Sequence, residues 1–326
     1  MPKKRSRFLS EEELNLLDEQ THDYVENWSE AMQMFQKDGE LRGLREATLF
    51  YYEKEVRMAI RYLNEQQLGL LKPYELTKEH IEQNIILYMK NDKQLSVSSI
   101  NIRLTALKAF IKWLYDNKKI PSNPTQGIKK LKNRKKEIEV FSPDQLRRFF
   151  NAIEKNTWIG IRDRAICLVL LECGCRQNEL LNLNVSDINW EQNYLLIRHT
   201  KTFQMRKVPI TEVTKKALKR WLLVRGEAKT EQLFCSITNL KLSPRGLHQI
   251  IVKYGRKANI QGVRCSPHTF RSTCASLYVK SSGDLFSLQR IMGWTDISMA
   301  KVYVKFMHED VSELHKKHSP LNNLDI

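Results

Sequence analysis

The stretch SPHTFRSTCASLYVKSSGDLFSLQRIMGWTDISMAKVYVKF, residues 266–306, predicts three short helices in a row. Ser266 is suited to cap the first helix, and Pro267 fits its first position because no backbone N–H is needed there. Asp284 is suited to cap the second helix, and Gly293 fits the residue just past its end. A third helical stretch follows and carries Tyr303.

Three side chains of this stretch indicate phosphate chemistry. His268 and Arg271 lie three residues apart, so they share a face near the start of the first helix. A helix N-terminus that carries a histidine and an arginine is a good place to hold a phosphate. Tyr303 follows on the third stretch, and the three together indicate covalent phosphoryl transfer by a tyrosine. A basic helix packed near an ordinary aromatic residue is the alternative, and this stretch alone leaves both open.

Length, charge and cysteine content bound the class of protein. The chain has 326 residues, enough for about two domains, and its 54 Lys and Arg against 37 Asp and Glu give a net charge of +17, which indicates a polyanionic partner such as nucleic acid. Six cysteines form no paired CxxC sets, which argues against a zinc site and favours a reducing, cytoplasmic compartment. The start MPKKRSRFLSEEE lacks the apolar region of a signal peptide, and the longest apolar run, residues 165–171, is too short to span a membrane.

The first part of the chain predicts a helical DNA-binding domain. We expect residues 1–20 to form a basic tail and residues 21–128 to form an all-α unit of four helices. The fourth helix is the most regular, with an apolar stripe from Ile100 to Leu114 at helical spacing. Basic residues that lie off this stripe are predicted DNA contacts: Arg103, Lys108 and Lys112.

Residues 129–140 predict a basic linker. Like charges at high density repel one another and keep a segment extended. Such a linker can lie along a DNA backbone and neutralise phosphates; a solvated hinge is the alternative, and the overall charge favours contact. The predicted DNA contacts here are Lys129, Lys130, Lys132, Arg134, Lys135 and Lys136.

Residues 141–326 predict a second, mostly helical unit that contains a small hairpin. Residues 194–199 and 206–210 have the alternation of strands, and the turn TKTFQ between them carries Lys201. A later helix has a basic face on which Arg245 is a further predicted DNA contact.

Four motifs in this order resemble the tyrosine recombinase (phage integrase) family: LECGCRQNELLNLNVSDI resembles its first arginine box, HTKTFQMRKVPI its lysine hairpin, SPHTFRSTCASL its HxxR box and IMGWTDISMAKVYVKF its terminal box. The earlier segments RGLREATLFYYEKEVRMAIRYL and SVSSINIRLTALKAFIKWLYDNKKIPSNP resemble its helical core-binding domain. The resemblance covers nearly everything from about residue 22 onward. It implies a mainly α fold of two domains: an N-terminal four-helix, SAM-like bundle and a C-terminal α-rich catalytic domain with a small antiparallel sheet.

The resemblance implies a catalytic set on the residues that match the motifs. Tyr303 would attack a DNA phosphodiester and form a 3′-phosphotyrosyl bond. Arg176 and Arg271 would grip the non-bridging oxygens through planar forks, which a lysine does not offer. A phenol has a pKa of roughly 10, so it must lose its proton during the attack, and His268 is the nearest acceptor that the motif offers.

Three further residues complete this set. Lys201 is the family's proton donor to the leaving 5′-oxygen, with Lys207 as an alternative in the same hairpin. Trp294 stands where the family usually carries histidine, and its indole N–H can donate to a phosphate oxygen. Glu179, one turn beyond Arg176, is expected to orient that arginine or His268. No nucleotide cofactor is needed because the covalent link keeps the bond energy, and no metal-ligand set is visible.

The resemblance also implies the partners and leaves two rival functions. Members of the family act as a homotetramer on double-stranded DNA with inverted-repeat core sites, closing a C-shaped clamp around the duplex, and an accessory directionality factor is a further partner. The apolar spacing that begins at Met307 predicts a helix that packs into a neighbouring protomer or onto its own domain. The rivals are a type IB topoisomerase-like enzyme, disfavoured by the core-binding domain, and a non-catalytic DNA-binding protein, disfavoured by the intact catalytic set. Integration, excision, transposition and resolution are not distinguished.

Overall fold

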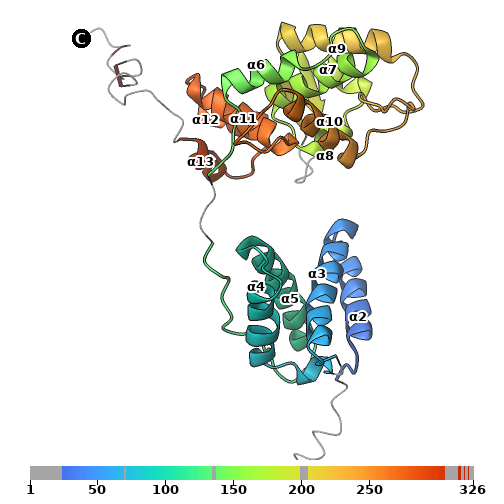
Figure 1. The fold of residues 1–326 in the computed structure, drawn as a ribbon, viewed down its shortest axis with the longest axis vertical. Coiled ribbons are helices and arrows are strands. Elements are labelled where there is room, and N and C mark those ends of the chain that lie inside the picture. The colour runs from blue at the N-terminus through green and yellow to red at the C-terminus, as the bar shows by residue number, and fades with distance from the viewer. Residues whose placement is uncertain are drawn as a thin grey trace, which may run out of the picture. The chain divides into compact units, whose positions relative to one another are not determined.

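The computed structural model describes residues 24–69, 71–133, 137–198, 205–304, 315–316, 319 and 322 (Figure 1). The chain divides into two compact units, unit 1 (Met1–Lys135) and unit 2 (Lys136–Ile326). Each unit has a hydrophobic core of its own. The division falls inside the basic stretch 129–140 that we predict to be a linker.

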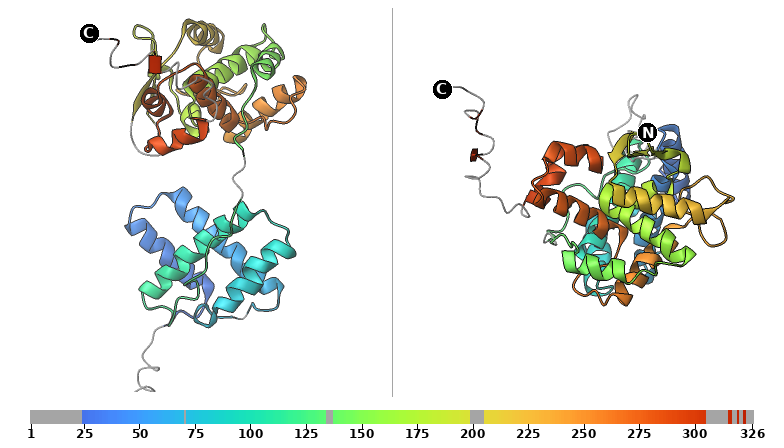
Figure 2. Two further views of the ribbon diagram at one scale, coloured as in Figure 1. Left: turned by 90° about the vertical axis from the view of Figure 1, so that its left-hand side faces the viewer. Right: turned by 90° about the horizontal axis from the view of Figure 1, so that it is seen from above.

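Unit 1 is a bundle of helices, as predicted. Its elements are α2 (Trp28–Leu41), α3 (Glu46–Glu65), the 3₁₀ turn η1 (Pro73–Glu75), the π-helical segment η2 (His80–Leu87), α4 (Tyr88–Asn91) and α5 (Val97–Asp116). α5 packs along α3 (Figure 2). The predicted stripe of α5 is confirmed, because Ile100, Leu104, Leu107, Ile111 and Leu114 are all buried in the core.

Arg103 lies inside unit 1. Its Nε donates to Glu55 Oε2 at 2.8 Å, and its Nη1 donates to the Tyr62 hydroxyl at 2.7 Å. The Arg103 side chain is only 14% exposed, and it neutralises a carboxylate that is itself 10% exposed. The structure contradicts the prediction of Arg103 as a DNA contact, because its guanidinium is turned inward as the partner of a buried carboxylate, which must be paired.

Except for Lys108, the other described side chains of unit 1 and the linker that we predict to contact DNA are more exposed to solvent than Arg103. Lys108 is half-buried and donates to the Ile128 carbonyl at 2.6 Å, so its stem packs on the domain. Lys112 is exposed and pairs with Asp116 one turn along α5. Three further predicted contacts are exposed: Lys129, Lys130 and Lys132. Three predicted contacts lie outside the described residues: Arg134, Lys135 and Lys136.

Unit 2 is mostly helical and holds a small sheet. Its elements are α6 (Pro143–Asn151), α7 (Trp158–Cys173), α8 (Gln177–Leu181), η3 (Val185–Asp187), β1 (Ile188–Asn189), β2 (Tyr194–Ile197), β3 (Arg206–Pro209), α9 (Glu212–Arg225), α10 (Pro244–Lys257), α11 (Pro267–Lys280), α12 (Leu285–Met292), η4 (Ile297–Ala300) and α13 (Lys301–Val304). The buried helix α7 packs against both α9 and α11 (Figures 1 and 2). The mainly α fold class with a small antiparallel sheet is confirmed.

The sheet has three antiparallel strands in the order β1-β2-β3. Leu195 and Val208 face each other across β2 and β3, and both are buried. The sequence predicts the hairpin but misses β1, because a strand of two residues has no alternation to detect. The turn of the hairpin, residues 199–204 with Lys201, lies outside the described residues.

The three predicted helical stretches that begin at Ser266 form within residues 266–304. Ser266 accepts from the Thr269 N–H and caps α11, while Asp284 accepts from two N–H groups and caps α12. Gly293 ends α12 in the left-handed conformation, with φ of 62°. The third stretch is the 3₁₀ turn η4 followed directly by α13, which carries Tyr303.

We expect Gly174→Ala to destabilise unit 2 more than a glycine substitution in open space. Gly174 ends α7 with φ of +54°, and a Cβ there would lie 2.5 Å from Met292 Sδ and 3.1 Å from Cys274 Sγ. The loss of unfolding free energy should be roughly 2–5 kcal/mol, the sum of about 1–2 for the left-handed backbone and about 1–3 for overpacking. Urea denaturation measures it.

The matched control is Gly262→Ala. Gly262 also has positive φ, +74°, but a Cβ there meets nothing within 4 Å. It should cost only the backbone part, about 1–2 kcal/mol. Equal losses in the two variants would mean that Met292 moves aside freely, contrary to our expectation.

Candidate active site

Three arginines from different parts of unit 2 bind the carbonyl end of α12. Three consecutive carbonyls there each accept a hydrogen bond: Ile291 from Arg206 Nε (2.8 Å), Met292 from Arg271 Nη2 (2.7 Å) and Gly293 from Arg176 Nη2 (3.2 Å). The last carbonyls of a helix have no partner within it and carry partial negative charge. The arginines supply the missing donors, so β3, α11 and the residue that precedes α8 converge on one helix end.

Glu179 is the carboxylate at the centre of this cluster. It accepts from Arg176 through the backbone N–H at 2.8 Å and Nη1 at 2.9 Å, and from Arg206 through Nη1 at 3.1 Å and Nη2 at 2.7 Å. The Glu179 side chain is 2% exposed. Burial raises the pKa of Glu179, but the hydrogen bonds and positive charge of Arg206 and Arg176 outweigh it, so the pKa lies below its usual value. Glu179 is therefore ionised and holds Arg176 in place. Of the two residues that Glu179 is expected to orient, Arg176 and His268, it binds Arg176.

Arg271 is held almost completely inside the domain. Besides Met292, its guanidinium donates to the Gly174 carbonyl through Nη1. Burial lowers the pKa of Arg271 to about 10, and the positive charge of Arg176 acts in the same direction. Arg176 and Arg206 pair with the carboxylate of Glu179, and Arg271 lies near enough to feel its charge. Three guanidinium groups against one carboxylate leave a surplus of positive charge that an anion would neutralise.

Five of the seven predicted catalytic residues line one pocket of about 550 Å³: Arg176, His268, Arg271, Trp294 and Tyr303. His268 is exposed in the first turn of α11, whereas Arg271, one turn later, is buried. Glu179 lies behind Arg176, and Lys201 lies outside the described residues.

Tyr303 is packed into the floor of this pocket. Its ring stacks on Trp294, with 5.7 Å between the ring centres and 15° between the planes. Both residues belong to an apolar cluster formed by α11, α12, η4 and α13. The Tyr303 hydroxyl donates to Ser272 Oγ at 3.5 Å, the outer limit of a hydrogen bond. Sequence reasoning missed Ser272, since a serine inside a helix that is buried on several faces carries no distinguishing pattern.

Arg206 is the second residue that sequence reasoning missed. It lies at the start of β3, where side chains alternate between two faces, and it shares a face with the buried Val208. A charged residue on the inward face of a strand was the available signal. Its neighbour Lys207, the predicted alternative to Lys201, points to solvent and places its ammonium 4.9 Å from the ring centre of Tyr194.

Arg245 belongs to a helix that is linked to this pocket by one hydrogen bond. It is exposed in the first turn of α10, directly after Pro244. The Pro244 carbonyl accepts from Nε2 of Gln177, which lines the pocket. The start of α10 is thereby joined to the start of α8.

The cysteines are free and do not gather into a site. Five of the six are buried, and Cys265 is half-buried. Burial raises the pKa of the Cys175 thiol to about 12, so this pocket-lining thiol is un-ionised near neutral pH. Within the described ranges, no group of three or more His, Cys, Asp and Glu side chains is arranged to hold a metal ion. None of the helices described is both long and apolar enough to cross a membrane.

Comparison with known proteins gives the family. The family model described as "Phage integrase family" matches residues 139–309, and "Phage integrase, N-terminal SAM-like domain" matches residues 31–120. Among curated proteins, the tyrosine recombinase XerC of Psychromonas ingrahamii is 27% identical over 282 residues, which cover 86% of this chain and 92% of that protein. A tyrosine recombinase of Pseudothermotoga lettingae is 25% identical over 270 residues, covering 83% and 91%.

Solved structures share the fold. A lambda integrase dimer bound to a COC′ core site aligns with a TM-score of 0.72 and 19% identity, over 91% of this chain and 82% of that one. The Tn1549 transposon integrase in complex with transposon right end DNA aligns with a TM-score of 0.70 and 21% identity, over 88% and 98%.

The chain therefore belongs to the phage integrase family. It is a tyrosine site-specific recombinase that acts on DNA, with the family's SAM-like domain at its N-terminal side.

We expect Arg206→Met to destabilise unit 2 strongly. The substitution removes the partner that holds both oxygens of the buried Glu179. Breaking a buried pair from one side costs about 3–5 kcal/mol, because the remaining charge is left uncompensated. Urea denaturation measures the loss, and the pKa of Glu179 should rise as well.

Lys257→Met is the control within the same unit. Lys257 pairs with Glu154 at 3.1 Å, but the two side chains are 47% and 56% exposed. Removing an exposed pair should change the unfolding free energy by less than about 1 kcal/mol. A similarly small loss for Arg206→Met would contradict our inference that the buried Arg206–Glu179 pair stabilises unit 2.

Proposed function

We propose that this recombinase cleaves and rejoins DNA at inverted-repeat core sites through a 3′-phosphotyrosyl intermediate formed by Tyr303. Its biological task would be the integration, excision, transposition or resolution of a mobile element or replicon. One observation carries the proposal: Tyr303, stacked on Trp294, lines the same pocket as Arg176 and Arg271. A phenol and two guanidinium groups in one pocket fit a phosphodiester under attack.

In the proposed step, the Tyr303 oxygen bonds to phosphorus while the bond from phosphorus to the 5′-oxygen breaks. Arg176 and Arg271 neutralise the charge that builds on the non-bridging oxygens. The phenolic proton passes to His268, which is exposed at the pocket. Lys201 supplies the proton that the leaving 5′-oxygen takes up.

Two residues would support the reacting groups without bonding to phosphorus. The Trp294 ring backs the nucleophile, and its indole N–H is the right donor for a phosphate oxygen. Glu179 holds Arg176 in place from behind. Catalysis would proceed without a nucleotide or a metal ion, because the arginines supply the positive charge and the phosphotyrosyl link conserves the bond energy.

The working assembly we propose is a homotetramer on two double-stranded core sites in the cytoplasm, with an accessory directionality factor as a further partner. The related lambda integrase occupies a core site as a dimer. Met307, Val311 and Leu314, whose spacing predicts a helix that would pack into a neighbouring protomer, lie outside the described residues. The DNA contacts that we retain are Lys108, Lys112, Lys129, Lys130, Lys132, Arg134, Lys135, Lys136 and Arg245.

Covalent capture tests the nucleophile. The protein is mixed in EDTA with fragmented DNA from its own replicon and denatured with detergent, and the attached DNA is sequenced. We expect attached fragments to share an inverted-repeat site, and Tyr303→Phe to abolish attachment because it lacks the attacking oxygen. Tyr278→Phe, which removes a hydroxyl beside the same apolar cluster, is the matched control and should retain attachment.

Other outcomes of this capture separate the rivals. Attachment without a common site favours a topoisomerase-like enzyme. DNA binding without any attachment favours a non-catalytic DNA-binding protein. Attachment that survives in Tyr303→Phe refutes the assignment of the nucleophile.

Arg176→Lys tests the proposed oxyanion contact. The lysine keeps the charge but loses the planar fork. Single-turnover cleavage of a core-site duplex should slow by about 10²–10³-fold, the usual loss for one donor to a transition-state oxyanion. Arg148→Lys, which changes an arginine on α6 whose side chain is 44% exposed, is the control and should leave the rate unchanged. Equal rates for Arg176→Lys and the parent protein would exclude Arg176 from the reaction.

A further inference from the structure

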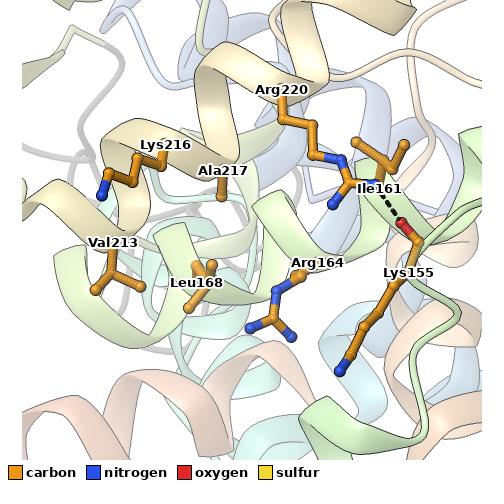
Figure 3. A pocket seen from close by; sticks show the side chains of 8 residues that line it. All are labelled: Lys155, Ile161, Arg164, Leu168, Val213, Lys216, Ala217 and Arg220. Carbon is orange, nitrogen blue, oxygen red and sulfur yellow. Dashed lines mark hydrogen bonds between the residues drawn. The ribbon is translucent and has the colours of Figure 1, made fainter.

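A second pocket, of about 310 Å³, lies between α7 and α9 (Figure 3). Four of its lining side chains are basic: Lys155, Arg164, Lys216 and Arg220. The others are apolar: Ile161, Leu168, Val213 and Ala217. We call this site the α7–α9 groove. α9 runs along the upper edge of unit 2 in Figure 1, whereas α8 and α13, which contribute to the catalytic pocket, lie along the lower edge.

The basic side chains of the groove have no carboxylate partner among the residues that the structure describes. Arg220 donates to the Lys155 carbonyl at 2.9 Å, and Arg164 lies over the Phe150 ring. The acids next to them in sequence point elsewhere, each bound to a cation outside the groove: Glu154 to Lys257, Asp163 to Arg162 and Glu212 to Lys215. Within the described part of the chain, four positive charges therefore surround the groove without a carboxylate that pairs with them.

The apolar part of the groove continues along α9. Val213 is 61% exposed, and Leu223, ten residues further, is 84% exposed. Val213, Ala217, Arg220 and Val224, which is 37% exposed, follow the spacing of one helix face, and Leu223 lies beside that face. The stripe is about 15 Å long at the usual rise per residue. Apolar side chains along one helix face, bordered by charge and exposed at both ends of that face, are typical of an interaction surface.

We propose that the α7–α9 groove docks an acidic amphipathic helix of a partner protein other than this chain. The two antiparallel walls of the groove suit a helix laid between them, with its apolar residues on Ile161, Leu168 and Val213. Carboxylates at three- and four-residue spacing on the edges of that helix would reach Lys216 and Arg220 on one side and Lys155 and Arg164 on the other.

The apolar floor is what favours a protein helix over duplex DNA. Phosphates would satisfy the lysines and arginines, but a DNA backbone has nothing apolar to cover Val213 or Leu223. A helix with one apolar face and acidic edges satisfies both features of the groove at once. Because the groove and the catalytic pocket are formed by different elements, a docked helix leaves the catalytic pocket open.

The probe is a synthetic 14-residue helical peptide with leucines on one face and glutamates on both edges. Its binding to the full-length protein is measured by fluorescence anisotropy. We expect saturable binding, and a loss of at least tenfold in affinity for the double variant Lys216→Glu, Arg220→Glu, since both contacts become repulsive. A peptide with the same leucines and lysines in place of the glutamates should bind at least tenfold more weakly.

The matched control reverses two charges outside the groove, Lys219→Glu and Lys229→Glu, both on exposed side chains. It changes the net charge equally and should alter the affinity for the acidic peptide less than twofold. Circular dichroism confirms that both double variants are folded.

Four outcomes would overturn the proposal. Equal binding of the two peptides would remove the role of charge, and equal losses in the two double variants would remove the role of the groove. Displacement of the acidic peptide by random-sequence duplex DNA, with the groove variant losing DNA affinity in parallel, would make the groove a nucleic-acid surface. A peptide of residues 305–318 of this chain that binds more than tenfold tighter than the acidic probe would make a second copy the occupant instead.

Discussion

The carbonyl end of α12 is the point on which the geometry of unit 2 depends. Without Arg206, Arg271 and Arg176, three consecutive carbonyls would be left without partners near the surface of the pocket. With them, segments far apart in the chain are brought to one place. Arg176 contacts both Glu179, which is 3 residues away, and the Gly293 carbonyl, which is 117 residues away. The arginines thus act first as structure: they cap a helix.

The same capping prepares the pocket for chemistry. Each guanidinium carries more N–H donors than the helix end uses, so Arg176 and Arg271 retain donors on the side that lines the pocket. Glu179 offsets one of the three positive charges, and burial, together with repulsion from Arg176 and Arg206, lowers the pKa of Arg271. An anionic phosphodiester would relieve this repulsion, while the carbonyls and Glu179 hold the donors in fixed directions. Electrostatic stabilisation of this preorganised kind does not require the groups to reorient during the reaction.

Sequence reasoning succeeded where local rules act and failed where partners are distant. Caps such as Ser266 and Asp284, and the left-handed Gly293, depend on a few neighbouring residues, so the limits of α11 and α12 followed from the sequence. The pocket residues followed because the order of four motifs identified the family. Arg103 was misplaced because its partner Glu55 lies 48 residues away, and nothing local shows that this carboxylate is buried.

The same limit hid Arg206, whose partner Glu179 comes from another element, and the α7–α9 groove, whose basic walls belong to helices far apart in sequence. In each case the decisive contact is between two elements, and the pattern within either element is ordinary. A family motif identifies residues that the members share because they take part in the same reaction. It does not find the residues that hold them in place.

The position of the proposed nucleophile illustrates how packing rather than helix propensity sets the site. α13 is four residues long, and a helix so short is not stable by itself. What holds Tyr303 is the stacking on Trp294 and the apolar cluster to which Leu288, Met292 and Ala300 belong. Trp294 follows Gly293 directly, and the Gly293 carbonyl is bound by Arg176. The side chain that would attack and the guanidinium that would receive the charge are therefore linked through the Trp294 ring and the Gly293 carbonyl, so we expect a shift of either one to displace the other.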